Sequence, residues 1–193
     1  MTAITLNLKP FVELSDDQFY QLCLNHRELK FERTAAGELV IMSPVGGVGG
    51  SREADLIADL VYWNRHSQLG GKVFSSSTCF KLPDGSDRSP DAAWITKENW
   101  NRLTTEQQHK FPPICPDFVI ELRSKSDAIA PLQQKMQEYI NNGLRLGWLI
   151  NPQDRQVEIC TANQSKRVID CPQQIDGADI LPGFVLNLSF LWD

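Results

Sequence analysis

The sequence has no long hydrophobic run, little histidine and no closely spaced cysteine pair. No apolar stretch reaches the roughly 20 residues of a membrane-spanning helix, and the start, MTAITLNLKP, lacks the basic region and long apolar core of a signal peptide. The five scattered cysteines form no CxxC pair, and the three histidines match no zinc-ligand spacing. We therefore expect a cytoplasmic protein with reduced thiols and no membrane partner.

An excess of positive charge is also absent. The chain has 19 Lys and Arg residues against 24 Asp and Glu residues, which gives a formal net charge of −5. Proteins that coat nucleic acid are usually basic overall, so this class is disfavoured. An enzyme that meets nucleic acid through a local basic cleft is compatible with this charge.

The glycine-rich stretch SPVGGVGGSR, residues 43–52, lacks the feature that would make it a phosphate-binding P-loop. That pattern requires Lys followed by Ser or Thr after the last glycine, whereas Ser51 and Arg52 stand here. We interpret residues 43–52 as a flexible loop that leads into a helix. The N-terminus of that helix could still border a site, because such termini attract phosphate oxygens.

What is present suits a single domain spanning residues 1–193, with 41% hydrophobic residues to build a core. Periodicity and turn signals predict helices at 15–27, 51–64 and 127–142 and strands at 30–33, 39–42, 72–82, 89–95 and 117–123, with two more strands inside 145–160. The apolar tail, residues 180–193, should dock on the core. This order predicts an α/β (α+β) fold with a mixed central β-sheet flanked by helices.

The stretch PDFVIELRSKSD, residues 116–127, carries an acid inside an apolar strand. Side chains alternate along a strand, so Glu121 shares a face with Asp117 and Val119. Asp117 lies four residues from Glu121, roughly 13 Å along a strand, which is too far for the two to hold one metal ion. A carboxylate partner for Glu121 must come from elsewhere in the chain.

Asp91 is the natural candidate for that partner. It begins the short strand SPDAAWI, thirty residues before Glu121 (121 − 91), after a proline that fixes the entry of the chain. Two acids from neighbouring strands can converge on Mg²⁺, which takes one or two protein carboxylates with waters and phosphate oxygens. Taken alone, Asp91 would be interpreted as a turn-capping residue.

Three cations could work with Glu121. Lys135 lies within or beside the apolar stripe of the helix at 127–142, where it either extends to solvent or reaches back to Glu121. Arg123 stays protonated, so it can clamp phosphate but cannot act as a base, whereas a lysine can orient water or shift its own pKa enough to join in proton transfer. Lys125 has the parity of Glu121 but follows the strand's exit, so we rank it after Lys135.

Three blocks in this order, SPDAAWI, PDFVIELRSKSD and LQQKMQEYINNGLRLGWLINP, followed by LPGF, resemble a restriction-endonuclease-like family, formerly a domain of unknown function, within the PD-(D/E)XK nuclease superfamily. The resemblance spans most of the chain and departs from the superfamily motif at Arg123, where lysine is usual. It implies a restriction endonuclease-like fold, with Asp91 and Glu121 as metal ligands and the backbone carbonyl of Leu122 as a third. Glu53 matches an additional metal-binding acid on an early helix. Lys135 would be the motif lysine, moved from strand to helix.

The expected function is a Mg²⁺- or Mn²⁺-dependent endonuclease that acts on nucleic acid, with DNA as the expected substrate and a homodimer expected by analogy. The alternative is a catalytically inert nuclease-fold protein that serves nucleic-acid binding or protein assembly. The acidic balance and Arg123 favour the alternative, whereas Glu53, Asp91, Glu121 and Lys135 together favour the enzyme. A hydrolase for another phosphate ester is a third hypothesis, since a fold alone does not decide function.

Overall fold

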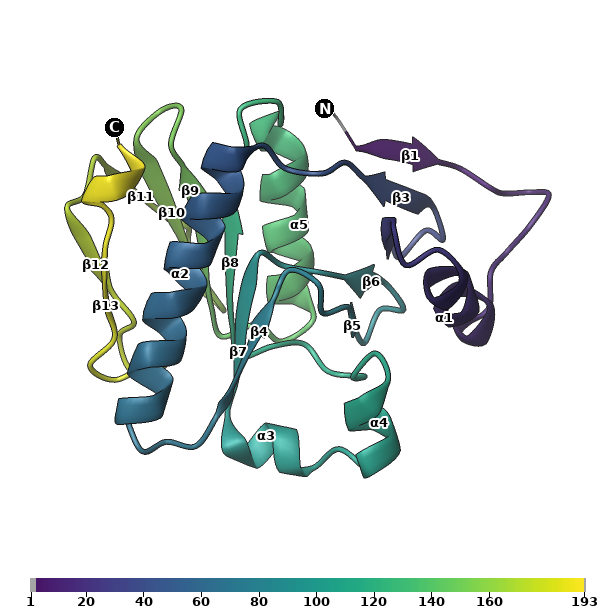
Figure 1. Cartoon of the computed structure of the whole chain (residues 1–193), viewed down its shortest axis with the longest axis horizontal. Coiled ribbons are helices and arrows are strands. Elements are labelled where there is room, and N and C mark those ends of the chain that lie inside the picture. Colours follow the sequence, from purple (N-terminus) through teal and green to yellow (C-terminus); the bar gives the residue numbers. More distant parts are fainter. Residues whose placement is uncertain (1–2, 193) are drawn as a thin grey trace.

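The computed structural model describes residues 3–192 and contains a six-stranded mixed sheet beside a five-stranded antiparallel sheet (Figure 1). The larger sheet has the order β11-β10-β9-β8-β7-β4. Its strands are β4 (Lys72–Ser75), β7 (Ala92–Ile95), β8 (Phe118–Leu122), β9 (Leu146–Asn151), β10 (Gln156–Thr161) and β11 (Arg167–Asp170). β8 and β9 run parallel, and the other neighbouring pairs run antiparallel. This is the mixed central sheet that the sequence predicts.

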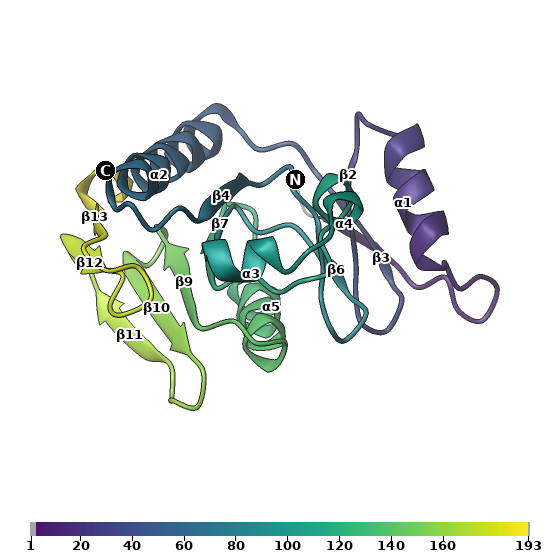
Figure 2. The same cartoon turned by 90° about the horizontal axis from the view of Figure 1, so that it is seen from below.

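Two helices cover opposite faces of the larger sheet, α2 (Gly47–His66) on one side and α5 (Ile129–Asn141) on the other (Figure 2). The alternation along β8 decides which side chains each helix meets. Phe118 and Ile120 belong to the core beneath α2, whereas Val119 packs in the core beneath α5 with Met136 and Tyr139. By the same alternation, Glu121 faces α5.

The smaller sheet has the order β1-β3-β2-β6-β5 and is covered by α1 (Asp16–Asn25). Its strands are β1 (Ile4–Leu6), β2 (Lys30–Arg33), β3 (Leu39–Met42), β5 (Phe80–Lys81) and β6 (Asp87–Arg88). The predicted hairpin of β2 and β3 is confirmed at both strands. The predicted start of α1 is also confirmed, because Ser15 and Gln18 form a capping box.

The remaining elements are two short helices between β7 and β8 and a C-terminal part after β11. α3 (Lys97–Asn101) and α4 (Thr105–His109) occupy the polar segment after β7. The C-terminal part forms a hairpin of β12 (Gln174–Asp176) and β13 (Val185–Asn187) and a 3₁₀ helix, η1 (Ser189–Leu191). Its apolar side chains pack into the core beneath α2, as the sequence predicts. Across residues 3–192, the helices are too short or too polar to cross a bilayer.

Two boundaries expected from the sequence are wrong. The glycine-rich stretch is not a loop throughout, since α2 begins at Gly47 after the N-cap Gly46. Buried Leu56 and Leu60 anchor this helix on the sheet, and packing outweighs the weak helix propensity of glycine. The long strand expected at 72–82 is two strands, β4 and β5, which belong to different sheets and are separated by a turn.

Candidate functional site

Asp91 immediately precedes β7, and Glu121 lies on the neighbouring strand β8. β7 and β8 are antiparallel and pair Ala92 with Ile120, so one step further along this register sets Asp91 opposite Glu121. Residues that are opposite in an antiparallel pair point to the same face of the sheet. The backbone N–H of Leu122 donates to Asp91 Oδ2 at 2.7 Å and fixes that carboxylate at the end of β8.

Glu121 is almost completely buried, with 3% of its surface exposed. Its Oε1 atom lies 2.8 Å from Lys135 Nζ and accepts a hydrogen bond of 3.1 Å from the hydroxyl of Tyr139. Burial raises the pKa of Glu121, and the nearby charge of Lys135 opposes this increase. Both partners come from α5, so the helix that covers this face of the sheet also determines how the carboxylate is held.

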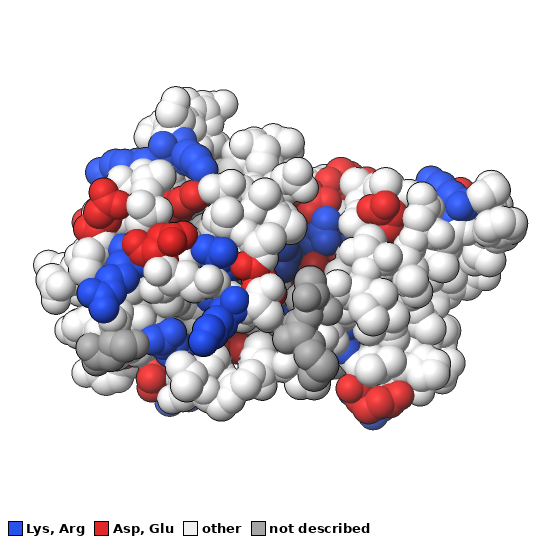
Figure 3. Space-filling model, turned by 90° about the horizontal axis from the view of Figure 1, so that it is seen from above, with Lys and Arg blue, Asp and Glu red and all other residues white. Residues whose placement is uncertain are grey.

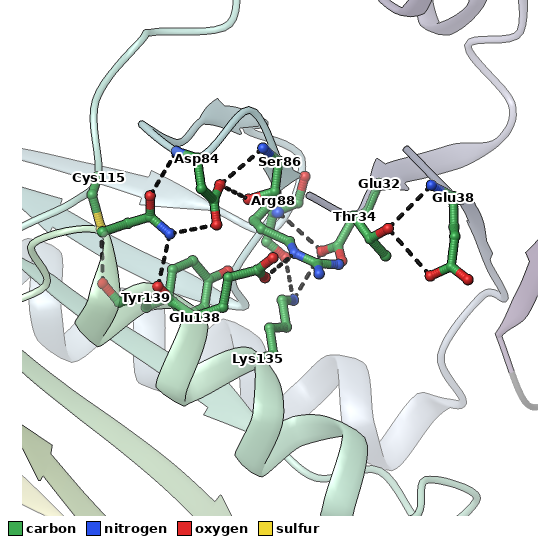
Figure 4. Close-up of polar contacts among 12 residues, drawn as sticks. Glu32, Thr34, Glu38, Asp84, Ser86, Arg88, Cys115, Lys135, Glu138 and Tyr139 are labelled. Atoms are coloured by element: carbon green, nitrogen blue, oxygen red, sulfur yellow. Dashed lines mark hydrogen bonds and ion pairs between the residues drawn. The ribbon is translucent and has the colours of Figure 1, made fainter. Parts of the chain in front are cut away.

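Lys135 lies between two carboxylates that come from different sheets. Figure 4 shows its contact with one of them, Glu32. Its Nζ atom is 2.8 Å from Glu121 Oε1 on β8 and donates at 2.8 Å to Glu32 Oε1 on β2. Burial would lower the pKa of Lys135, but the charges of Glu121 and Glu32 outweigh burial and raise it. Lys135 therefore reaches back to Glu121 instead of extending to solvent, and its pKa moves away from the range that proton transfer requires.

Glu32 is the main member of this cluster that sequence reasoning missed. It is 2% exposed, and besides Lys135 it accepts from Arg88 Nη1 at 3.1 Å and from the backbone N–H of Ser89 at 2.9 Å. Arg88 in turn donates to Glu138 of α5 at 2.5 Å. Burial alone would raise the pKa of Glu32, but the charges of Lys135 and Arg88 bring it down to about 2. Glu32 is thus a buried carboxylate with both oxygens engaged.

Asp91 and Glu121 have the chemistry that a hard divalent cation requires. Asp91 Oδ1 and Glu121 Oε2 accept no hydrogen bond from any residue between 3 and 192, whereas the other oxygen of each carboxylate is held. Burial, and after it the charge of Glu121, raises the pKa of Asp91 to about 7. The two negative charges therefore repel each other, and a bound cation would relieve this repulsion. Mg²⁺ is held by one or two protein carboxylates together with waters and substrate oxygens, and this pair fits that pattern.

Glu53 does not complete a three-carboxylate group. Within the described range, no three His, Cys, Asp or Glu side chains are close enough to hold one metal ion. Glu53 lies on α2, which covers the opposite face of the sheet from α5, and its carboxylate accepts a short hydrogen bond from the hydroxyl of Ser76. Asp91, Glu121 and Glu53 do not gather into one group here, and Glu53 as a metal ligand stays a prediction.

Comparison with known proteins identifies the family of the chain. A family model described as "Uma2: Putative restriction endonuclease" matches residues 16–189. The chain belongs to the Uma2 family.

A solved structure from Anabaena variabilis ATCC 29413, described as a putative nuclease belonging to DUF820, has the same fold. It is 18% identical in sequence, with a TM-score of 0.75, and the match covers 93% of this chain and 97% of that one. A search of curated proteins found no match. The restriction endonuclease-like fold predicted from the sequence is confirmed, and the Uma2 fold leaves the chemistry to be argued from the side chains.

Arg123, at the position where the nuclease motif usually has lysine, holds a turn together in this Uma2 chain. Its Nε atom donates to the carbonyl oxygen of Asp127 at 3.0 Å, and its Nη1 atom donates at 3.1 Å to both Asn151 and Asp154. Asp127 and Asp154 lie in the loops after β8 and β9, and Asn151 is the last residue of β9. Lys125 is exposed in the first of these loops. A contact between Arg123 and substrate phosphate stays a prediction.

The contacts of Arg123 predict how its replacement changes the stability of the fold and the rate of cleavage. Arg123→Met should lower the free energy of unfolding by about 1.5–3 kcal/mol, because hydrogen bonds to a charged group are removed. Metal-dependent cleavage should change by less than tenfold when it is measured well below the melting temperature. Chemical denaturation and a plasmid-nicking assay check the two parts, with Arg102→Met, at the exposed C-cap of α3, as the control. A hundredfold loss of cleavage with unchanged stability would instead assign Arg123 to phosphate binding.

Sequence signals for the missed residues were weak. Glu32 stands in Lys-Phe-Glu-Arg, where polar residues surround it and an acid is not conspicuous as it is in the apolar run of Glu121. Tyr139 was assigned to the apolar stripe of its helix, and that is where it lies, with its hydroxyl directed at Glu121. The only usable hint for Glu32 was that it is an acid in the middle of a predicted strand.

Proposed function

We propose that this chain is a metal-dependent endonuclease that hydrolyses phosphodiester bonds in nucleic acid, with DNA as the expected substrate. The observation that supports this best is the pairing of Asp91 and Glu121, each with one carboxylate oxygen held and the other free of hydrogen bonds. Membership of the Uma2 family supports the reaction class.

In this proposal Asp91 and Glu121 hold Mg²⁺ or Mn²⁺, with the carbonyl oxygen of Leu122 as a further ligand. The metal supplies Lewis acidity toward the phosphate and lowers the pKa of a bound water. Lys135 and Tyr139 hold Glu121 at the geometry it needs, since both contact the same oxygen, Oε1, and leave the other for the metal. Glu32 in turn fixes Lys135 from the opposite side.

The surface over this end of the molecule is electrostatically mixed. Figure 3 looks down on the end of the molecule that is uppermost in Figure 1, and Lys and Arg side chains are interleaved there with Asp and Glu side chains. Between the two parts of the molecule this face is hollowed, and charged side chains of both signs line the hollow. Such a surface fits a partner that is gripped at a few phosphates. A homodimer that places two sites along a duplex is the arrangement we propose, by analogy with other nucleases.

An inert nuclease fold is the second candidate. Two observations favour it. The net charge is −5, and Arg123 already donates hydrogen bonds to Asp127, Asn151 and Asp154. A fold kept for binding alone would not need two neighbouring carboxylates at one position, because their mutual repulsion and the partial burial of their charges cost stability. We therefore rank the enzyme first.

The deciding experiment is a nicking assay on supercoiled plasmid DNA. We expect cleavage with Mg²⁺ or Mn²⁺ and none when EDTA removes the metal, because the two carboxylates cannot activate water by themselves. Single-stranded DNA and RNA are assayed in parallel to define the substrate. Equal inactivity with every metal and every nucleic acid would reject the nuclease and leave the inert fold.

A further inference from the structure

We propose that Lys30, at the start of β2, contacts a backbone phosphate of the nucleic acid bound at Asp91 and Glu121. This inference rests on the proposed function and adds a residue that binds substrate beside the metal-binding pair. Lysine suits the role because its ammonium group is a compact charge on a flexible stem that can approach a phosphate from several directions.

Strand alternation places Lys30 on the side of β2 that faces the site. Lys30 and Glu32 are two residues apart, so their side chains leave the strand on the same face. Glu32 contacts Lys135 on that face, whereas Phe31 packs on the other face in the core beneath α1. Lys30 itself is half-buried, so its side chain borders the buried charge cluster and is still reachable from solvent.

The pairing of β2 with β6 directs Lys30 toward the segment that contains Asp91. β2 and β6 are antiparallel and pair Arg33 with Asp87. Three steps from this pair lead to Lys30 on one side (33 − 3) and to Pro90 on the other (87 + 3), next to Asp91. The N–H of Ser89 donates to the Glu32 carboxylate, which shows that the two segments are still in contact at this point.

Lys30 shares its face of β2 with Glu32, and it forms no ion pair within 4.0 Å with any residue from 3 to 192. Lys135 differs, because two carboxylates already neutralise it. Lys30 is thus a cation at the metal-binding pair whose charge is available to a ligand, and the anion that belongs there is a phosphate.

Salt-dependent DNA binding tests this inference separately from cleavage. A fluorescein-labelled DNA duplex is titrated with Asp91→Asn protein, which should bind without cutting, and with the same protein carrying Lys30→Gln or Lys30→Arg. Each titration is repeated at several KCl concentrations. Loss of one phosphate contact should weaken binding about tenfold and reduce the slope of log K against log[KCl] by about 1. Lys30→Arg should keep the slope, and Lys72→Gln on the edge strand β4 is the control.

The outcomes separate the two proposals. An unchanged slope for Lys30→Gln, in a protein whose wild-type form cuts DNA, overturns the role of Lys30 and leaves the nuclease intact. Wild-type protein that neither binds nor cuts nucleic acid overturns both. Melting temperatures of all variants show whether a weaker binder is still folded, and Lys30→Arg supplies the readout should Lys30→Gln fail to fold.

Discussion

Asp91→Asn should reduce Mg²⁺-dependent cleavage on the order of 10³-fold, because a metal ion stabilises the reacting phosphate by several kcal/mol and each 1.36 kcal/mol is a factor of ten in rate. Asparagine nearly matches the shape of aspartate, and its carbonyl oxygen can still accept the hydrogen bond from Leu122 N–H. The substitution therefore removes a charged metal ligand with little change in packing.

The same variant should keep its melting temperature or gain slightly. Asp91 is a half-buried carboxylate beside Glu121, and desolvation followed by that neighbouring charge raises its pKa to about 7, so a neutral side chain relieves repulsion in the folded state. Sites that bind metal or substrate commonly carry such a stability cost. Plasmid nicking and a thermal melt are measured together, with Asp170→Asn on the edge strand β11 as the control. Full cleavage by folded Asp91→Asn protein would remove Asp91 from the site.

Glu32→Gln should destabilise the protein by about 3–5 kcal/mol at pH 7, because it leaves two buried cations without their shared carboxylate. Lys135 and Arg88 both contact Glu32, and the side chains of all three are nearly buried. Urea denaturation monitored by tryptophan fluorescence measures the loss. Glu38→Gln, on the same hairpin at a residue that is hydrogen-bonded to Thr34, should cost less than about 1 kcal/mol.

The loss caused by Glu32→Gln should depend on pH in a defined direction. The pKa of Glu32 falls from its ordinary 4.5 to about 2 on folding, so its charge stabilises the folded state fully above about pH 4.5. This contribution disappears as the pH falls toward 2. The difference between wild type and Glu32→Gln should therefore be largest near neutral pH and shrink at pH 3. A difference that stays constant between pH 7 and pH 3 would show that packing, and not charge, explains the effect.

Much of the fold could be predicted because local patterns decided it. The alternation in FVIEL indicated a strand with two different faces, and the structure packs those faces against two different helices. The capping box at Ser15 and the hairpin at 30–33 and 39–42 are equally local signals, and both are confirmed. Pairing Asp91 with Glu121 required only that two consecutive strands be neighbours, which is common for antiparallel strands.

The rest depended on contacts that no local pattern specifies. Glu32 and Lys135 are 103 residues apart, and their ion pair exists only because the smaller sheet lies against α5. The sequence places Glu53 on an early helix, but the face of the sheet that α2 covers is a property of the whole topology. Arg123 resembled a motif cation until the loops after β8 and β9 were seen to surround it.

The ammonium group of Lys135 bridges the two sheets, so the geometry around Glu121 is linked to the folding of both. The first carboxylate it needs is made by residues near the beginning of the chain, and the second belongs to the central sheet. A folding intermediate in which only one sheet has formed would leave Lys135 half-paired and Glu121 poorly held. The position of the Glu121 carboxylate therefore depends on both sheets being folded together.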